Sequence, residues 1–322
     1  MLLHIQHETK LSYSEPVAET VFEVRMAPPS DEDQTNLGYR LRITPSPPVT
    51  AYRDGFGNRV DMFNILHPYR ELTVRATTVV RTHRRHGRER LAAVVWPIED
   101  ALPVEVVDFL QNSTLVKPCR ALTSFISSLP ALEGSVLNVV EIVIAAVRDT
   151  LKYEKKVTTA QTPLEEVLKL GRGVCQDFAH LFIGVCRGVG LPARYVSGYV
   201  EGPGELATHA WCQVWAGRNG WVDVDPTRGS IVEDNHVAIA VGRDYADVPP
   251  NRGVWRGRAE EVITVTVKVD PIDRMPHDWS DWGLQAPWMA STWTQNQSLR
   301  NGRPMNLHPR AGMKQQQSQQ QQ

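Results

Sequence analysis

The sequence is poor in cysteine, has no long apolar run and carries almost no net charge. Only four cysteines occur in 322 residues, too few for a fold held together by disulfides. No run approaches the roughly 18–20 apolar residues of a membrane span, and the N-terminal segment does not resemble a signal peptide. We therefore expect a cytoplasmic protein with reduced thiols and no membrane partner.

The charge balance argues against binding to nucleic acid. The net charge is −1, from 35 basic and 36 acidic residues, whereas a general nucleic-acid binder needs a strongly basic surface. One basic cluster, Arg81–Arg90, could contact phosphates. Gly87 within it favours a turn, so we expect this cluster to form a solvated hairpin tip.

Residues 1–95 are expected to form a β-rich domain, an antiparallel sandwich. Short segments rich in β-branched residues are separated there by Pro-Pro pairs and glycine-containing turns. These segments are Leu2–Thr9, Glu19–Met26, Gly38–Thr44, Val60–Ile65 and Glu71–Arg81. We find no catalytic group of residues in this part.

Residues 96–270 are expected to form a second domain, in which helices pack on an antiparallel sheet. Apolar residues at helical spacing come first, in Val104–Leu110, Cys119–Ser128, Ser135–Lys152, a segment that ends at Gly171, and Cys175–Val189. Strand patterns follow in Ala193–Val200, His209–Trp215, Trp221–Asp225, His236–Val241 and Val262–Val269. The fold class is therefore α+β.

The last segment, residues 271–322, differs from both domains. It holds four of the nine tryptophans and ends in KQQQSQQQQ. The glutamine tail is of low complexity, so we expect this segment to be partly disordered. Its tryptophans either dock on the domains or bind a partner.

Cys175 is the candidate nucleophile. The glycines of Gly171-Arg172-Gly173 allow a sharp turn into a helix whose first residues include this cysteine. Unpaired N–H groups at a helix N-terminus favour a thiolate and can also stabilise an oxyanion. The alternative is a small buried cysteine of the core, as expected for Cys119, Cys186 and Cys212.

His209 and Asp225 are the candidate base and orienting acid. The register of their two strands depends on the connection between them. A two-residue turn at Asn219-Gly220 would put His209 and Asp225 on opposite faces. A five-residue loop would make them diagonal neighbours on one face, about 7–8 Å apart between Cα atoms. We therefore favour Asp225, with Asp223 as the second choice.

The sequence resembles the bacterial transglutaminase-like family, whose core is papain-like. The resemblance rests on GRGVCQDFAHLFIGVCRGVGLPARYVSGYVEG and THAWCQVWAGRNGWVDVDPT, and residues 1–95 resemble the β-rich domain that precedes such cores. It implies that Cys175 is the nucleophile, His209 the base and Asp225 the orienting acid. It also implies a second oxyanion donor before the nucleophile, for which Tyr153 and Gln161 are the candidates.

The expected function is acyl transfer from an amide or peptide bond, without a cofactor. We favour hydrolysis of a peptide or protein substrate, since no calcium-binding loop is found. The alternatives are transamidation, as in transglutaminases, and a catalytically silent peptide-binding module. A zinc site built from Cys175, His180, Cys186, His209 and Cys212 is disfavoured, because no C-x₂-C pair occurs. The sequence leaves the oligomeric state open.

Overall fold

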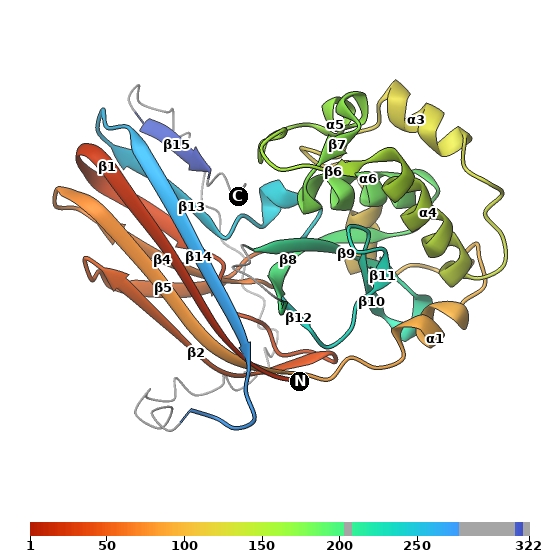
Figure 1. Ribbon diagram of the computed structural model, residues 1–322, viewed down its shortest axis with the longest axis horizontal. Coiled ribbons are helices and arrows are strands. Elements are labelled where there is room, and N and C mark those ends of the chain that lie inside the picture. Colours follow the sequence, from red (N-terminus) through yellow and green to blue (C-terminus); the bar gives the residue numbers. More distant parts are fainter. Residues whose placement is uncertain (203–207, 277–312, 318–322) are drawn as a thin grey trace, which may run out of the picture.

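The computed structural model describes residues 1–202, 208–276 and 313–317. A β-rich half lies beside a half in which helices pack against a second sheet (Figure 1). The expected α+β class, with an N-terminal antiparallel sheet and a separate helix-and-sheet core, is confirmed.

The β-rich half consists of eight strands. They are β1 (Leu2–Val24), β2 (Gln34–Thr44), β3 (Val49–Arg53), β4 (Arg59–Ile65), β5 (Tyr69–Thr82), β13 (Asn251–Arg256), β14 (Glu261–Pro271) and β15 (Met313–Gln317). The long strand β1 serves two layers, since its first half pairs with β5 and β14 and its second half with β4 and β13. Its register shifts between Ser12 and Val17, which allows the strand to change layers. Two predicted strands, Leu2–Thr9 and Glu19–Met26, are thus parts of one.

The chain returns to this half after the second sheet. We expected Val262–Val269 in the second sheet, within a domain ending at residue 270. Instead β14 pairs with β1 along its length, from Glu261 opposite Tyr13 to Pro271 opposite Leu3. The alternating pattern correctly predicts a strand there, but alternation does not specify which strand is its neighbour.

The C-terminal segment is described only in part. Strand β15 pairs with β13 and adds five residues of the glutamine-rich end to the sheet. The four tryptophans of the segment lie outside the described residues.

The second half contains a five-stranded antiparallel sheet and the helices packed against it. The sheet order is β11-β10-β9-β8-β12. Its strands are β8 (Ala193–Val200), β9 (His209–Trp215), β10 (Trp221–Asp225), β11 (Ser230–Ile231) and β12 (His236–Gly242). The helices are α1 (Gly87–Ala92), α2 (Val104–Val107), α3 (Arg120–Ser127), α4 (Val136–Thr150), α5 (Leu164–Leu170) and α6 (Cys175–Gly188). Helix α6 is buried from Gln176 to Cys186 between the sheet and the other helices, so it is the central helix of this half.

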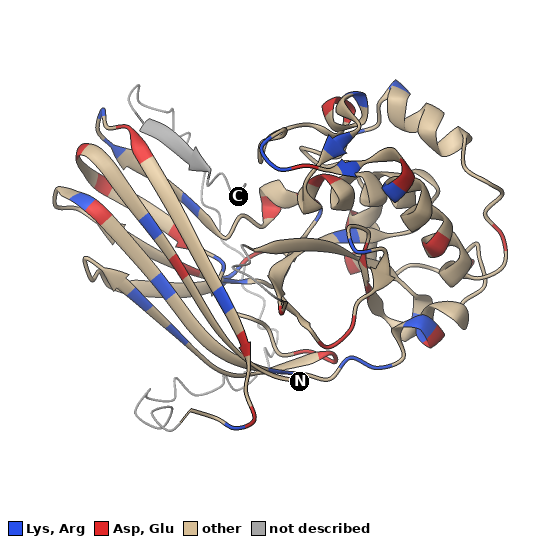
Figure 2. Ribbon diagram, viewed as in Figure 1, with Lys and Arg blue, Asp and Glu red and all other residues tan. Residues whose placement is uncertain are grey.

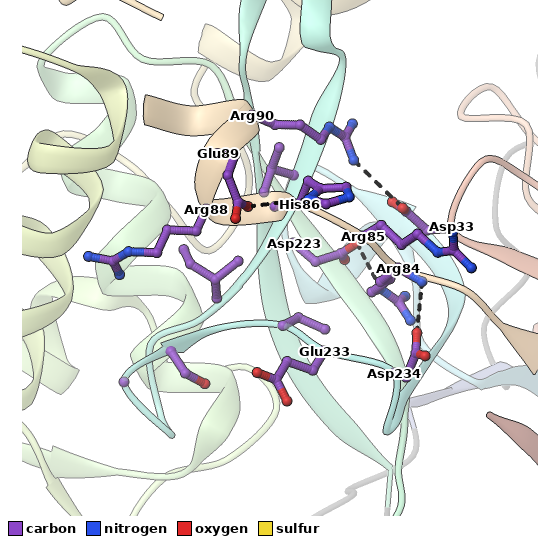
Figure 3. Close-up of a pocket in the computed structure, with 16 residues that line it drawn as sticks. Asp33, Arg84, Arg85, His86, Arg88, Glu89, Arg90, Asp223, Glu233 and Asp234 are labelled. Atoms are coloured by element: carbon purple, nitrogen blue, oxygen red, sulfur yellow. Dashed lines mark hydrogen bonds and ion pairs between the residues drawn. The ribbon is translucent and has the colours of Figure 1, made fainter. Parts of the chain in front are cut away.

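The cluster Arg81–Arg90 is not a hairpin tip, so that expectation is wrong. Strand β5 ends within it and α1 begins within it. Arg84 is buried, with its Nε 3.3 Å from Oδ2 of Asp223, and Arg90 faces Asp33 at 3.6 Å (Figure 3). Residues 84–90 of the cluster and these acids line a pocket of about 650 Å³. On the β-rich half, residues of both signs are interspersed along the strands (Figure 2).

Two side-chain amides join the halves by completing the outer edge of β12. The Gln34 amide donates to the Ala238 carbonyl (2.8 Å) and accepts from the Ala238 N–H (2.9 Å). Asn58 does the same with Val241, at 2.8 Å in both directions. These side chains pair as a neighbouring strand would, so the edge of β12 is covered.

A buried histidine lies at the same junction. His7 in β1 is fully buried, with Nδ1 2.6 Å from the Tyr199 hydroxyl and Nε2 3.1 Å from Thr9 Oγ1. Burial lowers the pKa of His7 to about 4. The ring therefore holds the two halves together in its neutral form.

We expect His7 to make the protein sensitive to acid. In the unfolded chain the pKa of His7 is about 6.5, so the unfolded state binds a proton below that pH. The folded state binds it only below about pH 4, so acid favours unfolding. Stability present above pH 6.5 should thus fall by about 3 kcal/mol as the pH drops to 4. Urea unfolding at neutral pH and at about pH 4.5 measures this loss, and His7→Gln should reduce it by about 2–3 kcal/mol. The exposed His86→Gln is the control; equal losses in both variants would contradict the assignment.

Candidate active site

A folded-back carboxylate shapes the start of α6. Asp177 Oδ2 accepts from the Val174 N–H and from Thr158 Oγ1, both at 2.7 Å. A Cβ at position 173 would lie 2.3 Å from this oxygen, so only glycine fits there. Burial raises the pKa of Asp177 to about 6. The turn places Cys175 as the first helical residue, where its N–H has no helical carbonyl to bind.

The longer of the two loops considered connects β9 to β10. Trp215 pairs with Trp221, and Gln213 pairs with Asp223, with residues 216–220 forming the connection. This register brings His209 Nε2 to 2.8 Å from Oδ2 of Asp225. The orienting acid favoured from the sequence is therefore the one bonded to His209.

The second choice, Asp223, is engaged elsewhere. Its Oδ1 accepts from Trp211 Nε1 at 2.6 Å, and its Oδ2 faces Arg84 Nε at 3.3 Å. Trp211 in turn fills the space above Gly198, where a Cβ would come within 2.3 Å of the indole. Asp223 thus holds Trp211 beside the site, and His209 is hydrogen-bonded to Asp225 instead.

His209 also contacts the thiol of Cys175. Cys175 is among the neighbouring groups that raise the pKa of His209. Because Asp225 occupies Nε2, the ring nitrogen left for the sulfur is Nδ1. Burial lowers the pKa of His209, but the bonds to Asp225 and Cys175 outweigh it and raise the pKa to about 10. The imidazolium form of His209 is therefore favoured.

Asp225 is fully buried and remains charged. Its Oδ1 accepts from the backbone N–H groups of Thr227 (2.9 Å) and Arg228 (3.0 Å), and its Oδ2 from His209 and His236. Burial alone would raise the pKa of Asp225, but these hydrogen bonds hold it well below the ordinary value. The carboxylate can therefore stabilise an imidazolium without taking its proton.

His236 is the one site residue that sequence reasoning missed. It begins β12, and its Nε2 lies 3.2 Å from Asp225 Oδ2. Strand β12 flanks β8 on the side opposite β9, so the ring reaches Asp225 from across the sheet. The only available signal was its position at the start of a predicted strand, which gives no partner.

Of the two candidate oxyanion donors, Tyr153 is a neighbour of Cys175. Strand β6 (Lys152–Tyr153) pairs with β7 (Arg172–Gly173), which places Tyr153 opposite Gly173. The pKa of Tyr153 is raised by burial and by the neighbouring Cys175. Gln161 lies in the loop before α5, with its N–H bonded to Thr159 Oγ1.

The zinc ligands considered above do not come together. His180 Nε2 accepts from the Tyr245 N–H, and Cys212 Sγ lies against the Ala179 carbonyl. Within residues 1–202, 208–276 and 313–317, donor atoms of three potential metal ligands gather only at His209, Asp225 and His236. The two imidazoles are already hydrogen-bonded to the carboxylate of Asp225.

No helix in the described part is long and apolar enough to span a membrane.

Comparisons with known proteins show which family the chain resembles. Residues 129–226 match the Transglutaminase-like superfamily, and residues 3–81 match the Bacterial transglutaminase-like N-terminal region. An uncharacterized protein of Mycobacterium tuberculosis is 32% identical over 295 residues, covering 84% of this chain and 92% of that protein. A protein-glutamine gamma-glutamyltransferase of Pseudomonas aeruginosa is 35% identical over 100 residues, 26% of this chain and 15% of that enzyme. The crystal structure of a candidate cysteine protease from Cytophaga hutchinsonii has a TM-score of 0.69 and 25% identity, covering 86% of this chain and 93% of its own.

Proposed function

Because the chain belongs to the transglutaminase-like superfamily of cysteine-dependent enzymes, we propose that it hydrolyses amide or peptide bonds through Cys175, His209 and Asp225. The observation that carries this proposal is the position of His209, which is bonded to Asp225 and has Cys175 as a neighbour. Nucleophile, base and orienting acid are thus in contact, as acyl transfer by a thiol requires.

The first half of the reaction forms a thioester. The Cys175 thiolate attacks the amide carbonyl carbon, and a C–S bond forms as the carbonyl oxygen becomes an oxyanion. The Cys175 N–H at the start of α6 stabilises that oxyanion, with Tyr153 as the second donor. The imidazolium of His209 then gives its proton to the leaving nitrogen, the C–N bond breaks and the amine departs.

The second half releases the acid. Neutral His209, oriented by Asp225, takes a proton from water, whose oxygen attacks the thioester carbon. The C–S bond breaks, the carboxylic acid leaves and the thiolate is restored next to the imidazolium. If an amine replaces water, the same steps give transamidation.

Hydrolysis is favoured over transamidation by the extent of similarity. The likeness to the candidate cysteine protease covers 86% of the chain and both halves, whereas the likeness to the gamma-glutamyltransferase covers 26%. Transamidation is the second candidate because the gamma-glutamyltransferase, although matched over fewer residues, has the higher sequence identity, 35% against 25%. We propose a peptide or protein as substrate in either case.

The experiment is to incubate the protein with a peptide library, with and without a primary amine, and to identify the products by mass. We expect hydrolysed peptides under both conditions. Amine-linked products alone would establish the transferase, and no product would leave a binding module. Protein alkylated beforehand with iodoacetamide is the control. Peptide mapping should show Cys175 alkylated faster than the half-buried Cys119; equal rates would overturn the nucleophile assignment.

A further inference from the structure

We propose that His236 is a positioning residue of this site: a neutral imidazole that donates its Nε2–H to the oxygen of Asp225 that His209 also uses. Its hydrogen bond orients the Asp225 carboxylate and partly offsets the negative charge on Oδ2. This inference rests on the proposed role of His209 as acid and base. The observation behind it is that both Nε2 atoms lie within hydrogen-bonding distance of Oδ2, at 2.8 Å for His209 and 3.2 Å for His236.

With His236, the carboxylate of Asp225 is saturated. An ionised carboxylate has about four lone-pair positions. Two backbone N–H groups occupy Oδ1, those of Thr227 and Arg228, and two imidazoles occupy Oδ2. The group is fully buried, so water does not supply a missing donor. Without His236, Oδ2 would lose one of its two imidazole donors and keep the bond to His209 and the ion pair with Arg228 Nε at 3.8 Å.

The surroundings hold His236 in this orientation. Its side chain is 3% exposed, and its ring packs edge-on against Trp211 with centroids 5.1 Å apart. Its carbonyl accepts from Arg84 Nη1 at 2.5 Å, and Arg84 also faces Asp223, the acceptor of the Trp211 N–H. The ring is thus fixed through both its neighbour and its backbone.

The His236 ring is suited to be a neutral hydrogen-bond donor. Burial lowers the pKa of His236, although Asp225 opposes that effect; the other charged groups that face the ring are His209 and Arg228. A neutral ring that donates from Nε2 has a bare Nδ1, and Asn235 Oδ1 is placed 2.8 Å from that nitrogen. This tautomer requires the Asn235 amide in the flipped assignment, with its NH₂ group toward Nδ1.

The effect on the reaction follows from the shared oxygen. The partly positive hydrogen of His236 Nε2 faces Oδ2 and weakens its hold on the His209 imidazolium. Removing it would make His209 harder to deprotonate. Resolution of the thioester needs neutral His209, so that step would slow and its pH optimum would move upward.

The test uses the full chain with Cys175→Ala, labelled with ¹⁵N-histidine and titrated by NMR. The unmutated His236 should carry its proton on Nε2, with Nδ1 bare, at neutral pH. Adding His236→Phe should raise the titration midpoint of His209 by about half a pH unit or more. Adding His236→Gln, which retains an N–H donor, should restore the midpoint. His86→Phe, at an exposed site, should leave it unchanged.

Two results would overturn the inference. One is a proton on Nδ1 of His236 with a bare Nε2, which needs no substitution of His236 and so decides the matter even if His236→Phe fails to fold. The other is an unchanged His209 midpoint in folded His236→Phe. Neither readout depends on turnover. An inactive wild-type protein would therefore contradict the proposed function, whereas the NMR titration alone would decide this inference.

Discussion

Replacing Cys175 by alanine is expected to lower kcat on a cleaved peptide by about 10⁴-fold or more. Without the sulfur no thioester forms, and only binding and the oxyanion donors remain. Cys175→Ser should be nearly as inactive, because His209 does not ionise a hydroxyl as it does a thiol. The measurement is the single-turnover rate with the peptide identified in the library experiment.

Cys119→Ala is the matched control for this loss. Cys119 also stands at the start of a helix, as the N-cap of α3, and its Sγ accepts from the Leu122 N–H at 3.4 Å. Its substitution should cost about 1 kcal/mol of stability as a lost cap and leave kcat within about twofold. If Cys175→Ala keeps wild-type turnover, or both variants lose equally, the helix-start thiolate is not the nucleophile.

Local chemistry explains why Cys175 could be found from the sequence. The turn into α6 needs glycine where Asp177 folds back, and both residues lie within four positions of the cysteine. The pairing of His209 with Asp225 could be derived because β9 and β10 are adjacent in the chain and only their loop length was uncertain. Both inferences depend on short-range geometry, which spacing in the sequence reports directly.

Long-range pairings could not be derived in that way. The alternation of Val262–Val269 specifies two faces, but its partner β1 is about 250 residues away in the chain. His236 was missed for the same reason, since β12 is separated from β10 by two strands of the sheet, and only the folded sheet brings its side chain to Asp225. The Arg81–Arg90 cluster looked solvated because its acids, Asp33 and Asp223, come from distant segments.

Asp225→Asn is expected to lower kcat by about 10⁴-fold while the fold is retained. The amide oxygen must stay on the side of the Thr227 and Arg228 N–H groups, because those backbone donors cannot change. The NH₂ group then faces His209 Nε2, which must become an acceptor. The ring proton moves to Nδ1, toward Cys175, so neutral His209 no longer accepts the thiol proton.

The rate of Cys175 alkylation at neutral pH measures this change apart from turnover. Asp225→Asn removes the carboxylate that favours the imidazolium form of His209. Cys175 should therefore be alkylated more slowly in this variant than in the wild type. Asp223→Asn, at a buried acid two residues away, keeps the bond to His209 and should lose less than about tenfold in kcat. Equal losses in the two variants would mean that Asp225 acts by filling the core rather than by orienting the base.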